Sequence, residues 1–121
     1  MKRTLPLALL VLAAAFTAPA SSQDPYAALT GTYAIAGKEA IDPPPDQPQD
    51  THLQLYLTGS AARDLYQAMK AKPMPDECLG HDARTKFLGG IACTMQAGGK
   101  DYECSLAIDI QGQKLEAIYA C

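Results

Sequence analysis

Residues 84–121 read RTKFLGGIACTMQAGGKDYECSLAIDIQGQKLEAIYAC. Three short apolar runs are separated here by glycine-bearing turns, and the stretch holds three of the four cysteines. The Gly98-Gly99 pair suits a tight hairpin, because glycine accepts the positive φ that such turns require. Apolar and polar residues alternate from Tyr102 to Ile110, as in a strand with one buried face. The pattern predicts a three-stranded antiparallel meander, with a bulge at Gly89-Gly90 in its first strand.

The positions of the cysteines along these strands bear on their pairing. If Gly98-Gly99 is a two-residue turn, Cys93 falls opposite Cys104, and the strand cysteines all face the apolar side. A bridge between directly opposed strand residues is disfavoured, because their Cβ atoms usually lie too far apart. Of the possible arrangements we therefore expect Cys78–Cys93 and Cys104–Cys121.

Further elements precede the meander. Residues 51–58 alternate in polarity, which predicts a half-buried strand, and residues 31–36 are compatible with another short strand. A helix is expected from about residue 61 to 71, with Ser60 as its N-cap and an apolar stripe at helical spacing. The expected fold is α+β: a four-stranded, mainly antiparallel sheet in the order β-α-β-β-β, stapled by two disulfides. The helix packs on one face of this sheet, and the other face is wet.

The first 20 residues have the features of a secretory signal peptide. A basic start at Lys2-Arg3 leads into an apolar run that ends at Phe16, and the small residues Ala18 and Ala20 follow. The run is shorter than the roughly 20 residues that span a bilayer. We expect cleavage after Ala20, which yields a periplasmic or secreted chain without a membrane anchor. The alanine-rich leader is typical of bacteria.

Composition divides the remaining chain into two parts. Residues 21–50 form an extended segment with a proline-rich loop, and residues 51–121 form the disulfide-stapled α+β domain. Removal of Lys2-Arg3 takes the formal net charge from −3 to −5. An acidic chain without clustered Lys or Arg argues against nucleic acid or anionic lipid as a partner.

The sequence contains no evident catalytic constellation. Its two histidines, His52 and His81, lie in different elements, and neither accompanies a nucleophile motif. Cys78 and His81 could be zinc ligands together with Cys93 and Cys104. Their spacing matches no standard zinc site, however, and cysteines of exported proteins are usually oxidised. We therefore expect no enzyme activity, no metal and no cofactor.

Two charged segments are candidate binding loops. Residues 42–50 contain four prolines, which favour a stiff, extended loop that loses little entropy on binding. Residues 76–85 form a second loop, tethered at Cys78 and leading into the meander. The candidate binding residues are Asp42, Asp46, Asp50, His81, Asp82, Arg84 and Lys86. For both segments the ordinary alternative is a solvated connector. A third surface is the polar sheet face with His52, Gln54 and Asp109, which is the ordinary outer side of such a sheet.

These features favour a small exported protein that inhibits or neutralises another protein, such as a cell-wall hydrolase or a toxin. The segment from Cys78 to Asp82 resembles the Cys-x-x-His-Asp loop of the periplasmic vertebrate-lysozyme inhibitor family. Ala83 stands where that family has a second cysteine, so we assign no family from it. The alternative is a small-ligand-binding or envelope-stress accessory domain without catalytic activity, with its ligand between helix and sheet. The expected partner is another protein; the sequence indicates neither its identity nor an oligomeric state.

Overall fold

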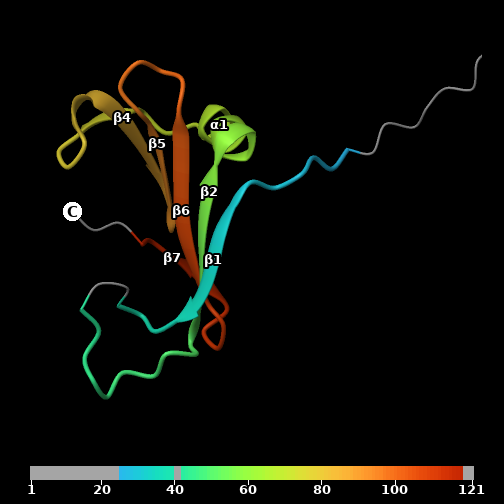
Figure 1. The fold of residues 1–121 in the computed structure, drawn as a ribbon, viewed down its shortest axis with the longest axis vertical. Helices are drawn as coiled ribbons and strands as arrows, with labels where there is room; N and C mark the ends of the chain where they lie inside the picture. The colour runs from blue at the N-terminus through green and yellow to red at the C-terminus, as the bar shows by residue number, and fades with distance from the viewer. Residues whose placement is uncertain (1–24, 40–41, 119–121) are drawn as a thin grey trace, which may run out of the picture.

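The structure, a computed structural model, describes residues 25–39 and 42–118. The expected signal peptide, its cleavage site and Cys121 lie outside these residues. The described chain forms one antiparallel sheet and one helix (Figure 1). The elements are β1 (Gly31–Ala36), β2 (His52–Thr58), α1 (Gly59–Ala68), β3 (Met74–Asp76), β4 (Gly80–Leu88), β5 (Ile91–Met95), β6 (Tyr102–Asp109) and β7 (Lys114–Glu116). No helix in this part of the chain is long and apolar enough to cross a membrane.

The sheet has seven strands in the order β1-β2-β6-β5-β4-β3, with β7 also paired to β6. The prediction of four strands was therefore wrong, although the class of a sheet with one helix is correct. β1 and β3 add two of the extra strands, and Gly89-Gly90 accounts for the third, since it is a hairpin turn and not a bulge: Leu88 pairs with Ile91 across it. Gly89 has a φ of 57°, a conformation that glycine adopts without strain. Phe87 consequently lies opposite Ala92 and on the other face from Ile91.

A second hairpin occupies the region expected to be a loop. β3 pairs with β4, so His81, Asp82 and Arg84 lie on a strand. Asp76 organises the turn between the two strands, since its Oδ1 accepts hydrogen bonds from the backbone N–H groups of Cys78 and Leu79, both at 2.9 Å. An aspartate in this role favours a tight turn.

The helix lies close to its predicted position but begins two residues earlier. Thr58 is its N-cap and makes no side-chain capping bond, so the expectation of Ser60 as the cap was wrong. The C-terminal end is held by Lys86 on β4. Its ammonium group donates to the carbonyl oxygens of Tyr66 at 2.9 Å and Met69 at 3.1 Å, and it lies 4.5 Å from the centre of the Tyr66 ring. A cation suits the carbonyl end of a helix.

The core lies between α1 and one end of the sheet. Ala62, Tyr66 and Met69 of the helical segment pack against Cys93 and Cys104, and all five are buried. Partly buried side chains surround this cluster: Leu57, Leu65, Ile91, Met95 and Tyr102. Cys93 and Cys104 therefore face the helix, as their sequence positions predicted.

The predicted disulfide pairing was wrong. Cys93 and Cys104 lie opposite each other on β5 and β6, as expected, and a disulfide joins them across a Cα–Cα distance of 4.0 Å. That short separation is typical of a non-hydrogen-bonded strand pair, in which side chains approach most closely. The bridges Cys78–Cys93 and Cys104–Cys121 are excluded by this bond. Cys78 is disulfide-bonded as well.

The second face of the sheet is not exposed to solvent throughout, contrary to expectation. Thr85, Ala92, Thr94 and Ala107 are buried on it. Loop and terminal segments contact this face: the Gln54 side chain donates to the carbonyl of Gly37, and the Ser105 hydroxyl donates to the carbonyl of Ile118. The sheet therefore has a small core under α1 and a more polar buried layer behind it.

Candidate functional site

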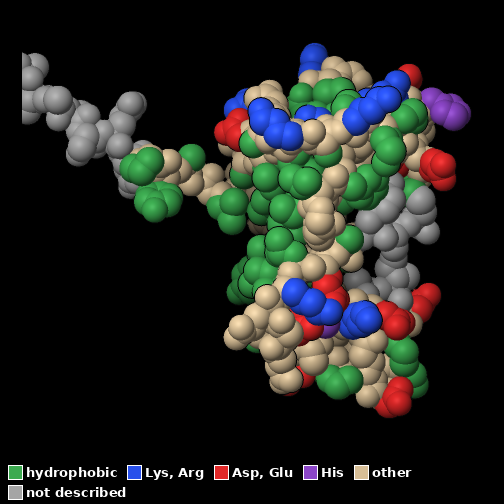
Figure 2. All heavy atoms as spheres, turned by 180° about the vertical axis from the view of Figure 1, so that it is seen from behind, with side chains coloured by type: hydrophobic (Ala, Val, Ile, Leu, Met, Phe, Trp, Pro, Cys, Tyr) green, Lys and Arg blue, Asp and Glu red, His purple; other side chains and the backbone are tan. Residues whose placement is uncertain are grey.

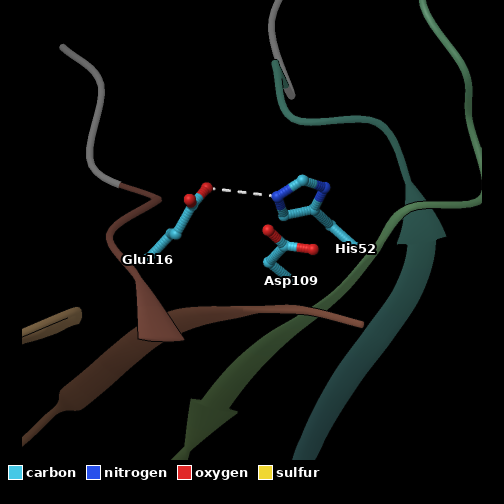
Figure 3. A group of neighbouring side chains, drawn as sticks. All are labelled: His52, Asp109 and Glu116. Carbon is cyan, nitrogen blue, oxygen red and sulfur yellow. Dashed lines mark hydrogen bonds and ion pairs between the residues drawn. The ribbon is translucent and has the colours of Figure 1, made fainter. Parts of the chain in front are cut away.

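One imidazole and two carboxylates converge on the second face of the sheet: His52, Asp109 and Glu116 (Figure 3). They come from β2, β6 and β7. One potential ligand atom from each lies within 4.8 Å of those of the other two. His52 Nε2 lies 3.1 Å from Glu116 Oε2, and the Asp109 carboxylate lies beside the same ring. We refer to these three residues as the His-Asp-Glu cluster.

Strand register brings the cluster together. His52 is the direct partner of Asp109, and Glu116 is paired with Ala107, two residues earlier on β6. All three side chains therefore point to one face at neighbouring positions. His52 is only 5 % exposed, and its Nδ1 lies 2.8 Å from the hydroxyl of Thr51. Both ring nitrogens consequently have partners, which fixes the orientation of the imidazole.

The Asp109 carboxylate is held by a turn. Its Oδ1 accepts hydrogen bonds from the N–H groups of Gly112 at 2.8 Å and Gln111 at 3.2 Å. These bonds, that of Gly112 foremost, hold the pKa of Asp109 below its ordinary value. A Cβ at position 112 would collide with this carboxylate, so glycine keeps the space beside it open.

The Glu116 carboxylate uses both of its oxygens. Oε1 accepts a bond from the Lys114 ammonium at 2.8 Å, and Oε2 accepts one from His52. The bond from Lys114 is the main reason that the pKa of Glu116 is lowered, and the same contact raises the pKa of Lys114. Asp109 and Glu116 are therefore both anionic at neutral pH.

A cavity of about 340 Å³ adjoins the cluster. Its wall combines His52 and Asp109 with residues from three other segments: Lys38 after β1, Gln47, Pro48 and Thr51 at the end of the proline-rich segment, and Gln111 and Gly112 in the β6–β7 turn. The loop is held over the sheet because the N–H of Gly37 donates to Gln49 Oε1 at 3.2 Å. The cluster therefore contains one buried side chain that could bind a ligand, His52, and it is reached from solvent through this cavity.

A different surface lies on the helix side of the sheet, beyond the end of α1. Two rows of side chains cross the strands there, and every member is apolar. We call them the apolar face: Tyr33, Leu55, Leu106, Ile91 and Leu88 in one row, and Ile35, Leu53, Ile108 and Leu115 in the next. Tyr33 is 74 % exposed, and Ile35, Leu88 and Leu115 are each about half exposed. In Figure 2, hydrophobic atoms gather between basic side chains above and a mixed charged group below.

β1 borders the apolar face and is an edge strand. It reads GTYAIA, without a charge or a proline, and five of its six residues are exposed. Proteins usually protect a sheet edge with lysine, proline, a bulge or a covering segment. β1 has no charge, proline or register shift of this kind.

A third opening lies beside the β3–β4 hairpin. This cleft has a volume of about 680 Å³ and is mostly apolar, with Met74, Pro75 and Phe87 among its lining residues. Its polar floor is a buried chain of hydroxyl and carboxylate groups. Thr85 Oγ1 donates to Asp76 Oδ2, and the Thr94 hydroxyl lies 2.8 Å from Thr85. His81 lines the rim.

The structure does not bring the predicted binding residues together into one site. Asp42, Asp46 and Asp50 are exposed along the proline-rich segment, and His81 and Asp82 are exposed on β4. Arg84 donates to the carbonyls of His81 and Ala83 on its own strand. Lys86 holds the helix end described above. The Arg84 and Lys86 side chains therefore make contacts within the fold.

The His-Asp-Glu cluster was only partly visible in the sequence. Alternation placed His52 and Asp109 on the same polar face, but their direct pairing joins β2 to a strand about 50 residues later and has no local signal. No protein-family model matches this chain, and the comparisons with curated proteins and with solved structures find no match either.

Proposed function

We propose that this chain is an exported, non-catalytic binding protein that docks another protein through β1 and the apolar face. The observation that carries the proposal is the coincidence of the two features: an uncharged edge strand lies at the border of two apolar rows, and the residues at the ends of these rows are exposed, namely Tyr33, Ile35, Leu88 and Leu115. Each feature alone occurs in many proteins. Side by side, they offer backbone hydrogen bonds and apolar area to the same partner.

The edge of β1 suits strand addition. In this mode an extended segment pairs with an exposed strand, its backbone supplies affinity and alternate side chains supply specificity. A segment added to β1 would direct every second residue to the side of Tyr33 and Ile35. Because β1 carries no charge, we expect the added segment to be apolar on that side and uncharged opposite Gly31–Ala36.

The apolar face supports a partner larger than a peptide strand. It spans five strands in one row and four in the next, which is roughly 24 Å by 14 Å at ordinary strand and residue spacing. Monomeric proteins seldom expose contiguous apolar patches of more than a few hundred Å² unless the patch is functional. The natural occupant is a partner that adds a strand to β1 and packs an apolar element across the neighbouring rows.

A second copy of this chain fits these features less well. Two β1 strands paired antiparallel would be related by a two-fold axis perpendicular to the joined sheet. The two apolar faces would then lie side by side on the same surface, so pairing would enlarge the exposed apolar area. A face-to-face dimer would cover the apolar area but leave both β1 edges unpaired. One different partner can satisfy both features.

More specifically, we propose that the protein acts as an inhibitor or immunity-type protein toward a hydrolase or toxin of the envelope. Export after cleavage at Ala20 would place the protein in the periplasm or the medium, and the Cys93–Cys104 disulfide is consistent with an oxidising compartment. The sheet would serve as a rigid support for this role, since binding to a preformed surface costs little ordering entropy.

The test begins with the mature protein immobilised in an envelope extract and identification of the retained protein. Binding of that purified partner is then measured for the wild type and for Tyr33→Asp. We expect affinity to fall roughly tenfold or more, because a charge would be buried in an apolar contact. Tyr56→Asp is the matched control, since Tyr56 lies on β2 and points to the opposite face.

Two outcomes would contradict the proposal. Equal affinity of the Tyr33→Asp variant and the wild type would exclude the apolar face as the contact. Concentration-dependent dimerisation of the wild type that Tyr33→Asp abolishes, measured by light scattering, would assign the face to a second copy instead.

The β3–β4 cleft favours a second candidate, a small-ligand-binding domain. Its volume of about 680 Å³ lies in the range of small-molecule sites. It lies beside the hairpin, and the space between helix and sheet is filled by Tyr66 and Met69. An apolar fluorescent probe tests this candidate: binding that Phe87→Asp abolishes and Tyr33→Asp leaves intact would favour it over protein docking.

A further inference from the structure

We propose that His52, Asp109 and Glu116 form a binding site for a divalent transition-metal ion, with Zn²⁺ as the best fit. The three donors come from three strands, and their ligand atoms lie within 4.8 Å of one another. This site is on the opposite face of the sheet from the apolar face. The inference therefore does not rest on the proposed docking function.

The distances suit one shared ion. Two ligands bound to tetrahedral zinc at about 2.0–2.1 Å are roughly 3.3 Å apart. His52 Nε2 and Glu116 Oε2 are 3.1 Å apart, so an ion could replace their hydrogen bond with little movement of either side chain. Asp109 points toward the same position (Figure 3). Its Oδ1 is held by the 111–112 turn, which leaves Oδ2 as the natural third donor.

The imidazole has the second partner that metal-bound histidines usually have. In the neutral ring without metal, Nε2–H donates to Glu116 and Nδ1 accepts from the Thr51 hydroxyl. With a metal on Nε2 the ring proton moves to Nδ1 and is donated to Thr51 Oγ1. Such a contact fixes the tautomer and the ring orientation of a ligand histidine. The hydroxyl can serve in either direction, so both states are satisfied.

Donor chemistry selects the ion. One imidazole and two carboxylates suit Zn²⁺ and its neighbours in the first transition row, whereas Mg²⁺ and Ca²⁺ prefer oxygen donors alone. Lys114 offsets part of the anionic charge through its bond to Glu116 Oε1. Three protein ligands leave the fourth position of a tetrahedral ion for water or a ligand atom. The adjoining cavity gives that position room.

The consequence for the fold is local. Glu116 lies on β7, a strand of three residues that pairs with β6 alone among the described strands. An ion shared with His52 and Asp109 would fasten β7 directly to β2 and β6. Ions that bind the folded state alone raise stability in proportion to the logarithm of their concentration.

The experiment is a calorimetric titration of the metal-free mature protein with Zn²⁺, with Mg²⁺ in a parallel run. We expect one Zn²⁺ per chain, a rise in melting temperature with Zn²⁺ and no comparable effect of Mg²⁺. Glu116→Gln keeps the size of the side chain and its contact with His52, and should weaken Zn²⁺ binding roughly tenfold or more. His52→Ala should do the same. His81→Ala removes the other, exposed histidine and is the matched control.

Co²⁺ supplies a readout that a loss of stability would not imitate. Tetrahedral Co²⁺ with a nitrogen ligand gives visible absorption, which we expect in the wild type and His81→Ala and not in Glu116→Gln. Circular dichroism establishes that each variant is folded. Zn²⁺ binding that is unchanged in both Glu116→Gln and His52→Ala, or lost in His81→Ala, would overturn the assignment, as would the absence of Zn²⁺ binding to the folded wild type.

Discussion

Cys93 and Cys104 lie directly opposite each other under the helix, and their disulfide ties β5 to β6 at the centre of the buried core. The bond spans 11 residues of sequence. It therefore closes a short hairpin and joins residues that are already neighbours in the sheet. This placement explains why the bridge is compatible with tight packing against Ala62.

The first prediction concerns disulfide connectivity. Peptide mapping of the non-reduced protein should give Cys93–Cys104, and the two remaining cysteines of the sequence, Cys78 and Cys121, should then be joined to each other. Replacing Cys93 and Cys104 together by alanine should lower the free energy of unfolding by about 3 kcal/mol, as expected for a loop of this length. A peptide that links Cys78 to Cys93 would contradict the observed pairing.

The second prediction concerns Lys86. Lys86→Met removes two hydrogen bonds to the end of α1 and the contact with the Tyr66 ring. We expect the free energy of unfolding to fall by about 2 kcal/mol, since hydrogen bonds that involve a charged group contribute more than neutral ones. Urea denaturation measures the change. Lys70→Met, at an exposed position, is the control and should leave the midpoint close to that of the wild type.

The third prediction concerns the buried polar chain below the β3–β4 cleft. Thr85 is 1 % exposed and its hydroxyl connects Asp76 with Thr94. Thr85→Val keeps the shape but removes that connection, which should cost about 1–3 kcal/mol. Thr32→Val on the exposed edge strand is the control. Equal stability of the two variants would mean that water or another group takes over the role of the hydroxyl.

The fourth prediction concerns acid stability. The pKa values of Asp109 and Glu116 are lower in the folded chain than their ordinary values, so both carboxylates stabilise the fold while they are ionised. Their contribution is complete above the ordinary carboxyl range, about pH 4–5, and is lost as pH falls through the lowered values. Melting temperatures of the wild type and Glu116→Gln, measured in metal-free buffer, should therefore differ at pH 7 and converge in strong acid. A gap that stays constant with pH would contradict the assignment.

Local patterns predicted the parts of the fold that depend on neighbouring residues. The strand before the helix lies where alternation placed it, and residues 31–36 form the short strand with which they were compatible. The helix lies within two or three residues of its predicted bounds. The register of Cys93 opposite Cys104 also followed from one glycine turn. These features are fixed within a few residues of chain, where turn geometry and side-chain periodicity operate.

Long-range pairing could not be predicted in the same way. β1 to β2 and β2 to β6 are adjacent only because distant segments share apolar rows. The His-Asp-Glu cluster depends on those pairings, so its members looked like ordinary polar residues of a wet face. Gly89-Gly90 was misassigned for a different reason: a two-residue hairpin and a bulge both use glycine, and the local sequence does not distinguish them.

Two consecutive residues of β7 contribute to the two opposite faces of the sheet. Leu115 pairs with Ile108 on the apolar face, and Glu116 reaches the imidazole of His52 on the other. Because this strand has only three residues, an ion bound at Glu116 and a partner docked on Leu115 would both restrain the same short segment. Occupancy on one side of the sheet would therefore be communicated to the other through a single peptide unit. By linkage, the metal affinity and the affinity for a docked partner would change by the same factor.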